Sequence, residues 1–168
     1  MTSFTVTSTE TAAGALNYFN GFHDGFMKRI VIESQDRMEE DRGQTCTGLF
    51  DVEIDFAHYN YADGAAPFHP YNQIVRADFR NVQDILADFH VAYLGHTVIS
   101  LSIANASRRR AGQVVIGRMV APEECLGLRL GRHYYVENER RYELRESQLF
   151  TFTDAVFEEQ PAVLSGRL

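Results

Sequence analysis

A strict alternation of apolar and acidic side chains over residues 50–56 is the strongest constraint on how this chain can fold. Every second residue there is large and apolar, and those between are acidic: Phe50, Val52, Ile54 and Phe56 alternate with Asp51, Glu53 and Asp55. A period of two puts the apolar side chains on one face of a β-strand and the acids on the other. One face must be buried and the other solvated, which is typical of an antiparallel sheet.

The same period of two recurs along most of the chain. It predicts further strands at residues 4–6, 26–33, 74–80, 97–104, 113–120, 126–130 (with 132–136 as an extension) and 148–153. Two segments have helical spacing instead. Residues 9–19 allow a short helix, and residues 81–94 carry one apolar stripe between Asn81, a candidate N-cap, and Gly95. We therefore expect a mainly β (or α+β) fold: an antiparallel curled sheet, sandwich or half-barrel, with one amphipathic helix near 81–94.

Length and composition indicate one globular domain. The 168 residues fit a single domain over 1–168, with residues 1–8 and 160–168 expected to be loosely held ends. A composition of 45% hydrophobic and 23% charged residues excludes disordered and fibrous classes. No apolar run approaches the ~20 residues that a membrane span needs, and the first residues do not resemble a signal peptide. The sequence predicts no membrane partner and a cytoplasmic location.

The net charge of −7 is concentrated in one half of the chain. Residues 1–84 hold 13 acidic and 6 basic side chains, whereas residues 85–168 hold 10 of each. An acidic surface repels phosphate backbones, so we expect no nucleic-acid partner, and the basic run at 108–110 is interpreted as a solvated turn. Cys46 and Cys125 match no CxxC pattern and are predicted to be reduced thiols.

Sequence signatures of catalysis are missing. The chain has no Gly-x-Ser-x-Gly, His-Glu-x-x-His or Gly-x-Gly-x-x-Gly motif. Residues 112–117 have the glycine spacing of a P-loop, but Arg118 and Met119 stand where Lys and Ser or Thr are required. We therefore predict no cofactor, and no metal ligand set is assigned.

Three sets of residues remain as candidate ligand- or partner-binding sites. His23 and Asp24 lie in a glycine-flanked turn, where they could bind a metal, act as an acid–base pair or simply form a tight turn. The acids Asp51, Glu53 and Asp55 project on one strand face ~7 Å apart, as a cation or acid–base site or as an ordinary solvated face. If the strands near 28 and 53 pair, Lys28 or Arg29 would neutralise them.

The third set lies in a long connection over residues 58–73. Its aromatic and imidazole side chains suit ligand or protein contact, a transition metal, or simple packing: His58, Tyr59, Tyr61, His69 and Tyr71. The two histidines are eleven residues apart, which is no recognised ligand spacing.

Several of these features together resemble a known group of proteins. They are the turn at 22–25, the strand ending at residues 29–32, the alternating strand at 49–56 and the segment at 79–82. This pattern resembles small uncharacterised bacterial β-rich domains, some of which look like immunity proteins of contact-dependent toxin systems. The resemblance covers residues 20–90, although the 58–73 connection is longer than in that group. It implies no catalytic residues.

Three functions follow as hypotheses. The first is a non-enzymatic protein-binding domain, immunity-like, whose acidic half faces a basic protein such as a nuclease toxin. The second is a small metal- or ligand-binding enzyme in which His23, Asp24 and either His58 or His69 act together. The third is a homo-oligomeric accessory protein that forms a symmetric dimer through exposed edge strands.

Overall fold

The structure is a computed structural model built mainly of antiparallel strands. It describes residues 1–22, 25–41, 43–58, 73–85, 97–98, 101–108, 123–130, 133–137, 140–144 and 147–160. Within this part of the chain, the mainly β class and the curled antiparallel sheet predicted from the sequence are confirmed, and no sheet closes into a barrel. No helix among these residues has the length and apolar character needed to cross a membrane.

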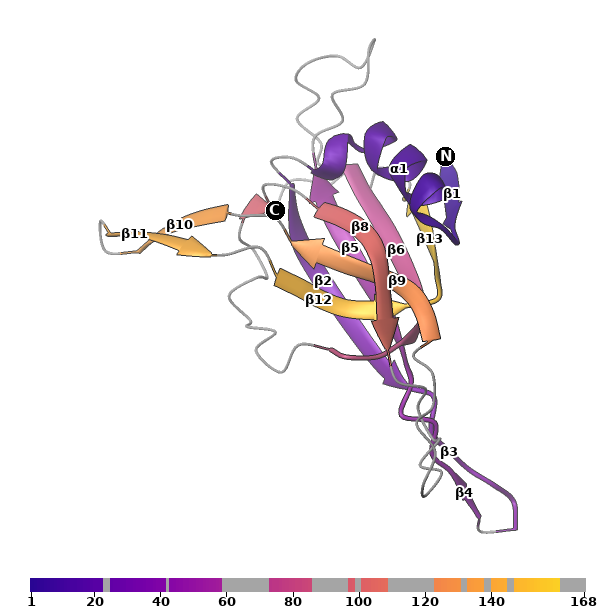
Figure 1. Ribbon diagram of the computed structural model, residues 1–168. Coiled ribbons are helices and arrows are strands. Elements are labelled where there is room, and N and C mark those ends of the chain that lie inside the picture. The colour runs from indigo at the N-terminus through magenta and orange to yellow at the C-terminus, as the bar shows by residue number, and fades with distance from the viewer. Residues whose placement is uncertain are drawn as a thin grey trace, which may run out of the picture.

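Two sheets face one another (Figure 1). The larger has six strands in the order β1 (Ser3–Val6), β13 (Asp154–Glu159), β6 (Gln73–Val82), β5 (Phe50–His58), β2 (Gly25–Ser34) and β7 (Thr97–Val98). The smaller has three, in the order β12 (Ser147–Phe152), β9 (Glu123–Leu130) and β8 (Leu101–Arg108). Two hairpins extend from this body: β3 (Arg37–Met38) with β4 (Gln44–Thr45), and β10 (His133–Glu137) with β11 (Arg140–Leu144). The described part is thus a two-layer sandwich.

Large apolar side chains fill the space between the two layers. The ring of Phe79 on β6 lies 5.0 Å from each of the rings of Phe150 and Phe152 on β12, in edge-to-face contact. The ring centroid of Phe22 lies 4.6 Å from that of Phe56 on β5. All five rings are almost fully buried. Because the apolar residues of β5 and β6 alternate with charged ones, one face of these two strands packs in the core and the other faces solvent.

The helix α1 (Thr9–Tyr18) packs against the sandwich near β1 and β8 (Figure 1). Ser8 caps it, accepting a hydrogen bond from the Thr11 amide, and Ala12 and Ala15 are buried beneath it. This is the short helix that the spacing over 9–19 allows. A left-handed turn follows at Asn20–Phe22, with φ values between 50° and 58°.

The prediction of a helix beginning at Asn81 is wrong over residues 81–85. Asn81 and Val82 are the last residues of β6, and Gln83 pairs with Thr151 in an isolated bridge. Asn81 has a φ of +51°, a left-handed conformation that asparagine tolerates better than most residues. The rest of the predicted helix, residues 86–94, lies outside the described residues.

Other expectations also change in detail. Residues 3–6, expected to belong to a loose end, pair with β13, and the Thr2 amide bonds to Glu159. Residues 133–137 form β10 in a separate hairpin rather than an extension of β9. The predicted strand at 113–120 and the C-terminal residues 161–168 lie outside the described part.

Candidate functional site

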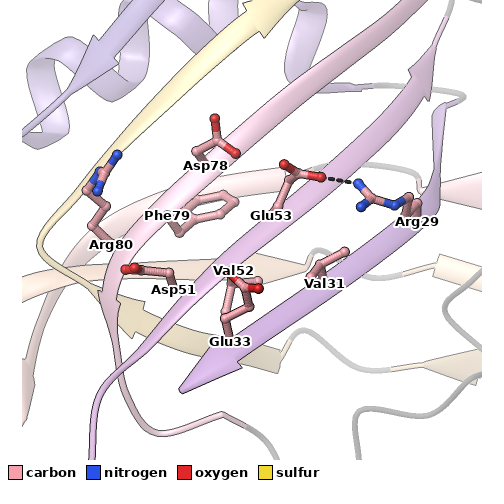
Figure 2. Close-up of a pocket in the computed structure, with 9 residues that line it drawn as sticks. All are labelled: Arg29, Val31, Glu33, Asp51, Val52, Glu53, Asp78, Phe79 and Arg80. Atoms are coloured by element: carbon pink, nitrogen blue, oxygen red, sulfur yellow. Dashed lines mark hydrogen bonds and ion pairs between the residues drawn. The ribbon is translucent and has the colours of Figure 1, made fainter. Parts of the chain in front are cut away.

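The solvent-facing side of β2, β5 and β6 carries a cluster of charged side chains. Here it is called the outer face, and its charged members are Arg29, Glu33, Asp51, Glu53, Asp55, Arg76, Asp78 and Arg80. It arises because each strand turns its apolar alternate residues to the core. A hollow of about 280 Å³ lies within it and is lined by side chains of all three strands (Figure 2). The predicted acid row therefore does lie on one face.

Two arginines from the neighbouring strands form ion pairs with Glu53 and Asp55 of the row. Arg29 on β2 donates to Glu53 (Figure 2). It also lies 3.6 Å from Asp55. Arg76 on β6 grips Asp55 with two hydrogen bonds, Nε–Oδ1 at 2.9 Å and Nη2–Oδ2 at 3.4 Å, and its Nε lies 3.6 Å from Glu53. The hydrogen bond to Asp55 raises the pKa of the Arg76 guanidinium. This confirms the expected neutralisation by Arg29 and adds Arg76.

The remaining acids are set against like charges. Asp78 stands directly opposite Glu53 across β6 and β5, and Glu33 stands directly opposite Asp51 across β2 and β5. Burial, followed by the charges of Glu53 and Glu158, raises the pKa of Asp78 above its usual value, against the opposing effects of Arg76 and Arg80. Opposed like charges destabilise a sheet.

No arginine or lysine of the described chain forms an ion pair with Glu33, Asp51 or Asp78, which are called the unpaired acids below. Asp51 accepts a hydrogen bond of 2.8 Å from the neutral side chain of Gln35, which leaves its charge uncompensated. Arg80 lines the same hollow, but it too forms no ion pair with a described residue. The outer face thus has a neutralised part and an acidic part.

The described residues supply no metal centre at the acid row. Among the described residues, no three His, Cys, Asp or Glu side chains lie close enough to hold a metal ion. Asp55 is 8% exposed and is already bound on both oxygens by Arg76, so it has little capacity for another ligand. The geometry suits electrostatic recognition better than acid–base chemistry.

The other predicted site residues are only partly placed. His23 and Asp24 lie outside the described residues, as do Tyr59, Tyr61, His69 and Tyr71. His58 is the last residue of β5, where its backbone pairs with Gln73. The structure therefore brings together Asp51, Glu53 and Asp55 but does not test whether the three candidate sites converge.

Sequence reasoning missed Arg76 and Asp78 as members of the site. The alternation over 74–80 does place both on a solvated face, but only the pairing of β6 with β5 brings them beside the acid row. That pairing contains a bulge between Phe50 and Val52, which shifts the register in a way that alternation does not reveal.

Comparison with known proteins adds no further assignment, because no family model, curated protein or solved structure matches this chain.

Proposed function

We propose that this chain is a non-enzymatic protein-binding domain whose outer face docks on a basic surface of a partner protein. The observation that carries the proposal is the set of unpaired acids, Glu33, Asp51 and Asp78, each of which faces a like charge across the sheet. In the isolated domain, that arrangement costs stability. A lysine or arginine from a partner would offset the repulsion between these acids, so the loss of repulsion would favour binding.

The paired acids support the same function in a different way. Arg29 and Arg76 hold Glu53 and Asp55 on three adjacent strands, and a sheet is a rigid support. A surface that is ordered before binding loses less conformational entropy when the partner arrives. The neutralised part thus positions the acidic part.

The chemistry of this face defines the partner class. Carboxylates attract lysine and arginine and repel phosphate, so the partner is a basic protein and not a nucleic acid. Nucleases carry such basic surfaces to bind phosphates, and an immunity-like domain would cover one of them. The proposal places the domain in the cytoplasm, in keeping with Cys46 as an exposed thiol and Cys125 as a buried one.

The test uses a lysine-rich peptide as a probe of basic surfaces and a charge-matched control. The test variant carries Glu33→Gln, Asp51→Asn and Asp78→Asn. The control carries Glu10→Gln, Glu40→Gln and Glu124→Gln, three exposed acids outside the outer face. Both variants lose three negative charges, so only the position of the lost charges differs.

We expect the wild type to bind the peptide with an affinity that falls as salt rises. The test variant should bind at least about tenfold more weakly, since exposed ion pairs contribute up to about 1 kcal/mol each. The control should remain within about twofold of the wild type, because screening limits the reach of distant charges to about 10 Å. Equal losses of affinity in both variants, or a wild type that does not bind the peptide, would refute the proposal.

A further inference from the structure

The edge of β2 is unpaired over most of its length in the described structure. On one side, β2 pairs with β5 from Phe26 to Ser34. On the other side, β7 pairs only with Gly25 and Phe26, and no described strand continues along Lys28–Ser34. The backbone N–H and C=O groups of such an edge are a template for another strand.

An exposed apolar side chain lies on the same edge. Ile32 is 46% exposed, one of only three large apolar side chains of the described residues that are this open to solvent. It shares its face with Ile30, which packs against the core. A strand added to this edge would cover Ile32 and extend the inner apolar face.

The sequence of β2 is complementary to itself in one register. In a symmetric antiparallel pair, opposed residues share a face, so one residue must lie directly opposite its own copy, with the two-fold axis midway between the two. With the axis at Val31, Arg29 of one copy faces Glu33 of the other on the outer face, and Ile30 faces Ile32 on the inner face. Charge and apolar contacts are then matched on both faces.

Neighbouring registers lack this match. An axis at Arg29 would oppose two arginines, and an axis at Glu33 would oppose two glutamates. An axis at Ile30 or Ile32 would place Val31 against a charge. The stretch from Arg29 to Ser34 is also the regular part of β2, since its bulge lies between Met27 and Arg29.

We propose that two copies of this chain associate through the β2 edges, about a two-fold axis at Val31, to form one continuous sheet. Arg29 is half exposed, so it can reach Glu33 of a second copy while holding Glu53. Glu33, an unpaired acid within its own chain, gains a partner. This association goes beyond the binding of a basic protein; the two surfaces share Glu33, and Asp51 and Asp78 remain for the basic partner.

The first test is Glu33→Arg, measured by sedimentation across a wide range of concentration. Within one chain, the new arginine faces Asp51, so thermal stability should be unchanged or higher. In the dimer it faces Arg29 of the second copy, so dimerisation should weaken at least about tenfold. Ile32→Lys should also give monomers, whereas Met38→Lys, at a residue 75% exposed on the β3–β4 hairpin, should leave the dimer intact.

The second test reads the register by disulfide cross-linking in a Cys46→Ser background. Val31→Cys should cross-link, since directly opposed residues have Cα atoms ~4.5–5.5 Å apart, within the disulfide range. Glu33→Cys should not, because the two copies of residue 33 would lie four residues apart, ~13 Å. A wild type that is monomeric at every concentration and a Val31→Cys variant that does not cross-link would overturn the proposal. Cross-linking through Glu33→Cys instead would overturn the register.

Discussion

Asp78 is an acid of the outer face whose pKa is raised in the folded chain. Burial and the opposed Glu53 raise its pKa, so the folded chain holds the Asp78 proton more tightly than the unfolded chain does. Its contribution to stability is therefore most favourable below the usual aspartate pKa of about 3.9, and it is lost as pH rises through the raised folded value.

Asp78→Asn should accordingly stabilise the fold at pH 7, because asparagine resembles the protonated acid. The expected gain in the free energy of unfolding is about 0.5 kcal/mol, the size of a solvent-screened cross-strand charge pair. In urea titrations at a series of pH values, the gain should vanish near the usual aspartate pKa. Glu40→Gln, on the exposed hairpin, is the control: an equal gain there would mean that only net charge matters.

Ser8 determines how α1 begins. The Thr11 amide donates to its hydroxyl at 3.2 Å, and the Ser8 amide donates to the Thr11 hydroxyl at 3.0 Å, so each residue satisfies the other. The helix has only ten residues and buries two alanines, Ala12 and Ala15. A helix this short is marginal by itself, so its cap and its packing must hold it.

Ser8→Ala should lower the free energy of unfolding by about 1 kcal/mol, the usual value of a lost N-cap. Ser8→Asp should restore most of that loss, because a carboxylate can accept the same hydrogen bond at the positive end of the helix. Thermal unfolding followed by circular dichroism measures both. The control is Thr7→Ala, since the Thr7 contact to Thr11 uses only its backbone amide. If Thr7→Ala costs as much as Ser8→Ala, the cap is not the cause.

The strands could be predicted from the sequence because alternation directly reports which face is buried. Residues 50–56 and 74–80 fall within β5 and β6 as predicted. The prediction of a helix near 81–94 was wrong at its start because asparagine is common in two different local structures. It caps helices, but it also adopts the left-handed conformation, as Asn81 does here.

The contacts of Asn81 explain why the second role prevails. Its amide nitrogen donates to Thr153, its amide oxygen accepts from Gln35, and its carbonyl oxygen accepts from Arg108. These partners come from three other segments of the chain, so they cannot be predicted from the sequence around Asn81. The same reason limits prediction of the site: alternation places Asp51, Glu53 and Asp55 on one face, but which charges oppose them depends on strand register.

At the scale of the whole molecule, the two proposed surfaces would combine. A two-fold axis through a pair of antiparallel edge strands is perpendicular to the sheet, so both copies would present their outer faces on the same side. Arg29 of each copy would face Glu33 of the other at the seam, and Asp51 and Asp78 of each copy would remain acidic to either side of it. Such a dimer offers two separate acidic patches to a basic partner.

Two patches on one rigid sheet predict avidity. Ile32→Lys, which should separate the copies without altering Asp51 or Asp78, should leave the affinity for a short lysine-rich peptide in solution nearly unchanged. On a surface densely coated with that peptide, the wild type should dissociate at least tenfold more slowly than the variant, because rebinding of a second patch is intramolecular. Surface plasmon resonance at high and low peptide density measures this difference. Equal dissociation rates at high density would mean that the two outer faces do not act together, even if each proposal holds alone.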